Sequence, residues 1–251
     1  MNTVPISPGH RDHQVIGSIF NTPVTVDGYS WIPITQGIGW VLMSWVAGKR
    51  RTHLNPVERT YVGAITMPIL LGSEWCHNLA HVYAANAIGK PMDELRIIWG
   101  MPRCVYKNLN DPDVTPRQHI IRSLGGPLFN LLLLPFAILA RALSKSGTTA
   151  REAANVAVGT NMFLSTVSLL PIPGIDGGPI LKWSLVERGH EPTKADEVVQ
   201  KANGVLGVFL AFISGLGFKK RRRFLGLLSG LLAIVSLGIF AGWIKEEELP
   251  F

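Results

Sequence analysis

The feature that most constrains this chain is a series of long apolar blocks separated by short polar stretches. Six blocks approach the length of about 20 residues that a helix needs to cross the hydrocarbon core of a bilayer. These blocks are residues 31–48, 60–86, 119–140, 153–172, 203–218 and 224–244. Hydrophobic residues make up 47% of the chain and charged residues 16%, which is atypical of a soluble domain. The sequence therefore predicts an α-helical, multi-pass integral membrane protein with about six transmembrane helices.

Two regions outside these blocks predict β-strands. Residues 15–20 and 24–26 are β-branched runs joined by a short polar turn, and they predict a β-hairpin at the membrane interface. Residues 95–99 and 104–106 predict two further strands between the second and third spans. We expect a small sheet at the membrane edge, with residues 95–99 as the open edge to which a partner strand could be added.

The organisation of the chain predicts one membrane domain with polar ends. Residues 1–30 form an N-terminal segment that contains the hairpin, and residues 31–187 form the membrane core. Residues 188–251 contain a surface segment and two C-terminal transmembrane helices. Within this last region, residues 190–201 are polar and predict a short surface helix.

The formal net charge of +7 is concentrated between the last two apolar blocks, where residues 219–223 are all Lys or Arg. A basic cluster between two spans is typical of a loop that meets lipid headgroups and orients the protein. The charge therefore indicates contact with the lipid bilayer and does not indicate nucleic-acid binding.

Two histidines lie four residues apart inside the second apolar block. On a helix, His77 and His81 are about 40° apart around the axis and roughly 6 Å apart along it, so both imidazoles can reach one metal ion. The alternative is that each histidine forms a hydrogen bond to a neighbouring helix. Ionisable residues inside a membrane are costly, which favours the functional interpretation.

A third candidate ligand follows two prolines that end a helix. Asp176 precedes Gly177 and Gly178, which let the backbone turn. Alone, Asp176 could be part of an ordinary Asp-Gly turn at the membrane surface. Together with His77 and His81, it completes a set of three zinc ligands with one position left open for water.

These residues occur with other motifs in an order that resembles the site-2 protease family of intramembrane zinc metallopeptidases. The resemblance spans residues 15–187 and includes an N-terminal segment at 16–24. It also includes a Gly-Gly-Pro-Leu-Phe-Asn run at 125–130 and an aspartate motif at 171–178. The last of these is the most specific.

The resemblance implies a site and a partner. It assigns zinc to His77, His81 and Asp176, and it implies that Asn130 helps to hold the substrate backbone near the metal. The alternative for Asn130 is a hydrogen bond between helices. The expected partner is a transmembrane segment of another membrane protein. The family also implies termini on the cytoplasmic side, whereas the density of basic loops favours the opposite orientation. We follow the family.

The sequence departs from the family where the general base is expected. The family has glutamate after the first histidine, and this chain has Asn78, whose amide cannot accept a proton at neutral pH. Glu74 lies one turn earlier and could be a hydrogen-bond acceptor for a ligand imidazole, a fourth ligand or, less favoured, a relocated base. Ser168 also replaces a common asparagine, which could alter substrate positioning.

The sequence therefore predicts a zinc-binding homologue of intramembrane metalloproteases that engages a partner segment and is catalytically impaired or inactive, a pseudoprotease. One alternative is an active protease that uses Glu74, and another is a protease in which Asn78 was introduced to trap a substrate complex. A remote alternative is an ion transporter, which rests only on buried polar residues.

Overall fold

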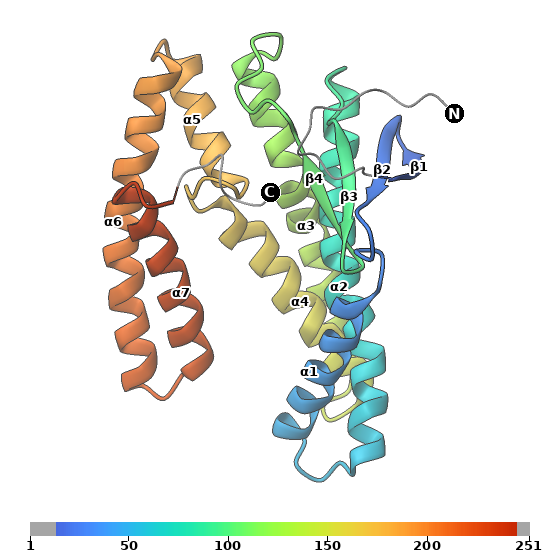
Figure 1. Cartoon of the computed structure of the whole chain (residues 1–251). Helices are drawn as coiled ribbons and strands as arrows, with labels where there is room; N and C mark the ends of the chain where they lie inside the picture. Colours follow the sequence, from blue (N-terminus) through green and yellow to red (C-terminus); the bar gives the residue numbers. More distant parts are fainter. Residues whose placement is uncertain (1–13, 245–251) are drawn as a thin grey trace.

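The computed structural model describes residues 14–244 and has helices with one small sheet (Figure 1). The bounds of its elements are β1 Gln14–Ile19, β2 Thr22–Val26, α1 Ile34–Arg50, α2 Pro56–Ala87, β3 Glu94–Ile98, β4 Met101–Val105, α3 Pro116–Leu143, α4 Thr149–Thr166, the 3₁₀ helix η1 Val167–Leu169, α5 Gly177–Glu187, α6 Pro192–Lys219 and α7 Arg223–Phe240. Residues 1–13, which belong to the predicted N-terminal segment, lie outside this range. The predicted division at residues 30 and 187 stays a prediction.

Helix α2 is the central element of the fold and packs against α1, α3 and α4. Its start is fixed by a capping box, in which the Asn55 side chain accepts a hydrogen bond from the Glu58 N–H and the Glu58 carboxylate accepts one from the Asn55 N–H. Helix α3 begins with the same arrangement at Thr115 and Gln118. These caps fix the two helices that carry the histidines and their supporting residues.

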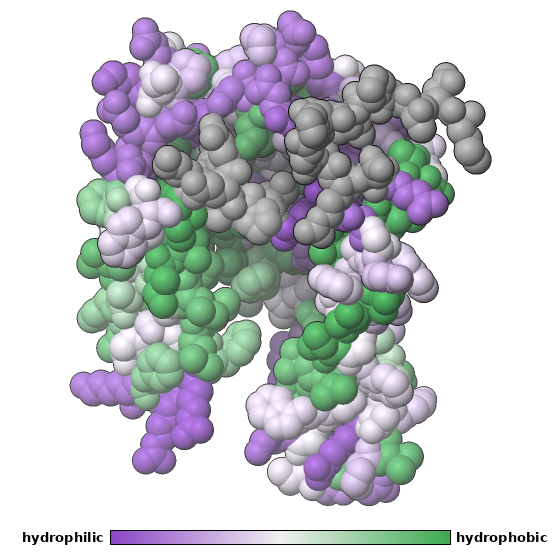
Figure 2. All heavy atoms as spheres, viewed as in Figure 1, coloured by the Kyte–Doolittle hydropathy of each residue, from purple (hydrophilic) through white to green (hydrophobic). Residues whose placement is uncertain are grey.

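Helices α6 and α7 pack on each other and stand to one side of α1–α4, with α5 between α6 and α3 (Figure 1). Figure 2 shows apolar side chains gathered over this pair between polar ends. Phe209, Phe212 and Leu231 are among the large apolar side chains exposed there. An exposed apolar band between polar ends is expected of helices that face lipid.

Among residues 14–244, α3, α6 and α7 have the length and apolar composition needed to cross a membrane. These helices support a membrane protein, but they do not confirm six spans. Helix α1 has 17 residues, and α2 and α4 bury polar side chains such as His77 and Asn161. In addition, the predicted surface helix at 190–201 is not separate, because α6 runs without a break from Pro192.

The four strands form one sheet in the order β1-β2-β3-β4. Strands β1 and β2 pair antiparallel, as do β3 and β4, whereas β2 and β3 are parallel. The sheet packs on α2 through a buried cluster that includes Val82 and Leu95. The predicted hairpin and the two further predicted strands are therefore present, with bounds that differ by a few residues.

The predicted open edge at residues 95–99 is wrong. Strand β3 pairs with β2 on one side and with β4 on the other, so the edges of the sheet are β1 and β4. The edge that lies beside the candidate metal ligands is β4, whose residues 101–104 line the same cavity as His77 and His81. Pro102 lies in this strand, and proline is tolerated in edge strands because it has no N–H to donate.

Candidate metal centre

Helix α2 directs the side chains of His77 and His81 toward one point. Both histidines are buried, and their Nε2 atoms lie 3.1 Å apart. This follows from the helical spacing of four residues, which puts both on the face of α2 that packs against α3. The predicted pair is therefore brought together by the fold.

Asp176 reaches the same point from the turn that precedes α5. One carboxylate oxygen lies 3.3 Å from His77 Nε2, and the other lies 3.1 Å from His81 Nε2. The following glycines allow this approach, because a Cβ at Gly177 would overlap the backbone of Leu169 and Leu170. The sequence separation between Asp176 and the histidines is closed by the packing of α5 on α3.

The other ring nitrogen of each histidine is held by an oxygen acceptor. His77 Nδ1 lies 2.7 Å from Asn130 Oδ1, and His81 Nδ1 lies 2.7 Å from the main-chain oxygen of Arg122. Both close partners are acceptors, and the Gly126 N–H approaches His81 Nδ1 only at 3.4 Å, so each Nδ1 is assigned the proton and each Nε2 presents a lone pair to the centre. Partners of this kind fix the tautomer and orientation of metal-binding histidines.

The amide of Asn130 is fully buried and links three helices. Its Oδ1 accepts from His77, and its Nδ2 donates to Asn161 Oδ1 at 2.8 Å. The Asn161 amide in turn donates to the main-chain oxygen of Ala157 at 2.8 Å. Asn130 therefore forms the inter-helix hydrogen bonds that were the alternative to substrate binding, and its role toward substrate stays a prediction.

The donor set and its dimensions fit zinc. The ligand atoms of His77, His81 and Asp176 all lie within 4.8 Å of one another, and the separations given above are 3.1 to 3.3 Å. Two ligands at about 2.0 to 2.1 Å from zinc and at the tetrahedral angle lie roughly 3.3 Å apart. Two imidazoles and one carboxylate also leave a fourth position open, as in catalytic zinc sites.

Asn78 and Glu74 lie beside this centre and bond to each other. The Asn78 amide is buried and donates to the Glu74 main-chain oxygen at 3.0 Å and to its Oε1 at 3.4 Å. Cys104 Sγ lies 3.4 Å from Asn78 Oδ1. Glu74 lines the cavity but does not belong to the group of three ligand atoms. The imidazole acceptors are Asn130 and the Arg122 carbonyl, so the structure gives Glu74 no contact of that kind.

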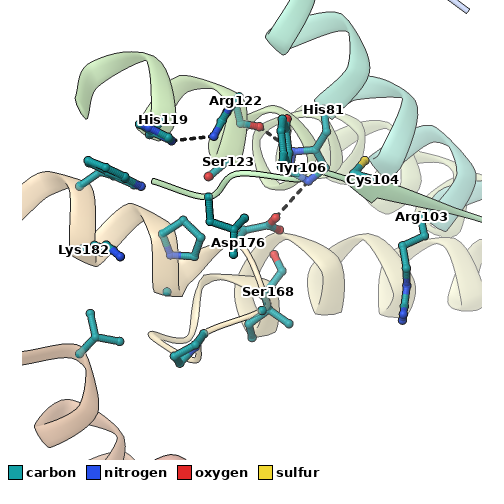
Figure 3. Close-up of a pocket in the computed structure, with 18 of the residues that line it drawn as sticks. His81, Arg103, Cys104, Tyr106, His119, Arg122, Ser123, Ser168, Asp176 and Lys182 are labelled. Carbon is teal, nitrogen blue, oxygen red and sulfur yellow. Dashed lines mark hydrogen bonds and ion pairs between the residues drawn. The ribbon is translucent and has the colours of Figure 1, made fainter. Parts of the chain in front are cut away.

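A cavity of about 1500 Å³ opens onto the three candidate ligands. Its wall includes β4, the start of α3, α5 and residues of α6 and α7. Figure 3 shows Asp176 pointing to His81, with Tyr106 and Arg122 on the same side and Ser168 on the other. The Ser168 hydroxyl donates to the Leu164 main-chain oxygen at 2.6 Å. A space of this size can hold several residues of an extended peptide beside the ligands.

Three supporting residues were not predicted from the sequence. Arg122 acts on His81 through its main-chain oxygen, which no side-chain pattern indicates. Asn161 could have been suspected, because a buried amide in an apolar helix needs a polar partner. Gly126 belongs to the motif at 125–130, but its packing against both imidazoles is visible only in the fold.

Replacing Gly126 by alanine should therefore weaken metal binding. A Cβ at this position would lie 2.6 Å from His77 Cε1 and would also overlap the Nε2 atoms of both histidines. We expect zinc affinity to fall at least tenfold, because the imidazoles must move out of tetrahedral geometry. Gly159→Ala is the matched control, since nothing lies within 4 Å of its added Cβ. Equal zinc content in both variants, measured by mass spectrometry of metals, would contradict the placement of the imidazoles.

Comparison with known proteins finds similarity in fold but no match to a sequence family. No protein-family model matches the sequence, and no curated protein sequence matches it. A solved structure, the site-2 protease from Methanocaldococcus jannaschii, is similar over 91% of this chain and 95% of that chain, with 14% identity and a TM-score of 0.50. This chain therefore has a site-2-protease-like fold. At this identity the comparison carries the fold and not the chemistry.

Proposed function

We propose that the protein is a site-2-protease-like membrane protein that holds one zinc ion and binds a transmembrane segment of a partner, with peptide hydrolysis impaired. The observation that carries the proposal is the convergence of His77, His81 and Asp176 in a site-2-protease-like fold, beside an amide at position 78. A bound zinc ion would polarise a peptide carbonyl and favour ionisation of water.

The impairment follows from the chemistry of the residue next to His77. Hydrolysis of a peptide requires a group that takes a proton from water and then gives one to the leaving amine. The Asn78 amide is a neutral donor and acceptor, and it cannot perform this transfer at neutral pH. Its side chain instead donates hydrogen bonds to Glu74, one turn earlier on the same helix.

One observation favours a second candidate function, an active protease that uses Glu74. The Glu74 carboxylate lines the cavity and lies 3.4 Å from the Asn78 amide, so it is close to the position where a base is required. It remains the second candidate because it stands one helical turn away from the residue adjacent to His77. A cleavage assay that compares the unaltered protein with Asn78→Glu separates the two functions.

The partner segment would pair with β4. The two-residue turn of the β3–β4 hairpin, Trp99 and Gly100, has positive φ at both positions, which is typical of a type I′ turn. In such a hairpin, hydrogen-bonded and non-hydrogen-bonded residue pairs alternate along the two strands, starting with the hydrogen-bonded pair next to the turn. Pro102 and Cys104 belong to non-hydrogen-bonded pairs, so their main-chain groups face away from β3. A helical segment must unwind before its carbonyls become accessible, and an extended segment can then add to this edge.

Crosslinking tests this edge. A photoreactive residue at Arg103, which lies on β4 in the wall of the cavity, should capture a transmembrane peptide. The control places the photoreactive residue at Val15, which lies on the opposite edge strand and is 62% exposed. At this position the yield of crosslinked peptide should be at least several-fold lower. Equal capture at both positions would place the binding surface elsewhere. The readout is the yield of crosslinked peptide at equal expression.

A further inference from the structure

Arg122 is a buried cation that lacks a counter-ion in the described part of the chain. The residue is 6% exposed and lies on α3, one turn before Gly126. Its Nη2 donates to His119 Nδ1 at 2.7 Å, and its guanidinium lies 4.0 Å from the centre of the Tyr106 ring. No carboxylate of residues 14–244 forms an ion pair with it, although Asp111 and Asp93 act on it from a greater distance.

The surroundings compensate this charge only in part. His119 accepts a hydrogen bond from Arg122 and is therefore neutral, and its ring is stacked on Trp183 at 3.8 Å. The neighbouring cation Lys182 differs, because its ammonium group pairs with Asp196 at 2.7 Å and donates to Asn110 at 2.8 Å. A buried charge without a partner is costly, so a guanidinium kept in this state is typical of a binding site for an anion.

The guanidinium also has a neighbour that can donate a further hydrogen bond. The Tyr106 hydroxyl is buried and has no hydrogen-bond partner among the described residues. Burial also raises its pKa, so the hydroxyl keeps its proton and can donate to an acceptor. Both Tyr106 and Arg122 line the cavity that opens onto the zinc ligands, and Figure 3 shows them together beside His81.

We propose that Arg122 and the Tyr106 hydroxyl form a subsite that binds a carboxylate beside the metal centre. The proposal rests on the proposed function in one respect, because the partner segment supplies this carboxylate, either as its C-terminus or as an Asp or Glu side chain. The free N–H groups of one guanidinium match the two oxygens and the single charge of a carboxylate. A phosphate monoester carries close to two charges, and Lys182 is already paired.

A pair of small probes tests the subsite without any partner. Binding of 4-fluorobenzoate and of 4-fluorobenzamide to the zinc-loaded protein in detergent would be followed by ¹⁹F NMR. Benzoate should bind about tenfold more tightly, which is the effect of one charge-assisted hydrogen bond. The preference should disappear in Arg122→Gln and persist in Arg117→Gln, an exposed arginine on the same helix. A preference that persists in Arg122→Gln, for instance through binding to zinc, would overturn the proposal.

A second variant guards against a folding defect. Arg122→Gln leaves the main-chain oxygen that holds His81, so zinc content equal to that of the unaltered protein shows that the site is intact. If Arg122→Gln does not retain zinc, the binding test uses Arg122→Lys instead. Lysine keeps the positive charge but lacks the planar guanidinium, whose paired N–H groups can bind both oxygens of a carboxylate. Benzoate binding should then fall several-fold, and unchanged binding would overturn the subsite. Inorganic phosphate that displaces benzoate at a lower concentration than acetate does would also overturn the carboxylate assignment.

Peptides then separate the two sources of the carboxylate. One transmembrane peptide is prepared with a free or an amidated C-terminus, and a second pair carries Glu or Gln at one internal position. A tenfold preference for one acidic form identifies the source, and it should be lost in Arg122→Gln. Benzoate preference without any preference between the peptides would overturn the assignment to a peptide carboxylate. Failure of the proposed function gives a different outcome. In that case the protein binds no zinc, or no peptide is crosslinked to β4, while the preference for benzoate over benzamide is still observed.

Discussion

Replacing Asn78 by glutamate is expected to raise the rate of transmembrane-peptide cleavage about 10²- to 10⁴-fold, the usual contribution of a positioned general base. The side chain at position 78 lines the cavity and follows His77 directly on α2. A carboxylate there can take a proton from water and return it to the leaving amine, whereas the amide can do neither. The measurement is the initial rate of peptide cleavage by purified protein in detergent or liposomes.

Asn78→Gln is the matched control for this prediction. It has the length of glutamate but no basic group, so its cleavage rate should stay at the level of the unaltered protein. Zinc content should be the same in all three proteins, because residue 78 does not belong to the group of ligand atoms. Cleavage by the unaltered protein at the rate of Asn78→Glu would show that this position does not limit the reaction.

Glu74→Gln separates the remaining explanations for any residual activity. If Glu74 is a relocated base, this change abolishes cleavage and leaves zinc in place. If Glu74 is a fourth ligand, zinc affinity falls together with activity. The bond from the Asn78 amide to Glu74 Oε1 at 3.4 Å can be kept by a glutamine oxygen, so a general loss of structure is not expected. Robust cleavage that persists in Glu74→Gln would leave the proposed chemistry without a base.

Replacing His77 by alanine is expected to abolish stoichiometric zinc binding. The change removes one of three candidate ligands and leaves the Asp176 carboxylate and one imidazole, which hold zinc much more weakly than three protein ligands do. It also leaves the buried Asn130 oxygen without its histidine donor. We expect at least a hundredfold loss of affinity, measured by competition with a chelating dye.

His53→Ala is the control for the loss of zinc, because His53 is exposed at the end of the molecule where α1 and α2 are joined. It should retain the full zinc content. Equal zinc content in His77→Ala and His53→Ala would remove His77 from the site. Loss of zinc in both variants would indicate that the metal is held by a different set of groups.

The three candidate zinc ligands could be predicted from the sequence because their signals are local. Helical spacing puts His77 and His81 on one face, and the proline and glycine residues around Asp176 mark a turn after an apolar helix. The structure brings the three together. The first hairpin and the two further strands were also predictable, because β-branched runs and turn residues are signals that extend over only a few positions.

What the sequence could not predict depends on contacts between distant segments. The order of strands is set by which segments pack on α2, so the pairing of β3 on both sides has no local signature, and the predicted edge was wrong. The number of spans is difficult to predict because α2 and α4 bury polar groups such as Asn161 inside the protein. The support of His81 by a main-chain oxygen is likewise visible only in the fold.

X-ray absorption at the zinc K-edge of the purified, unaltered protein tests the central claim most directly. The protein should contain one zinc per chain, coordinated by nitrogen and oxygen atoms at about 2.0 to 2.2 Å, with imidazole scattering from two histidines. Cys104 lies near Asn78 but does not belong to the group of ligand atoms, so no sulfur is expected. A zinc–sulfur distance of about 2.3 Å, or protein that binds no zinc when it is supplied, would contradict the assignment of His77, His81 and Asp176 as the metal centre.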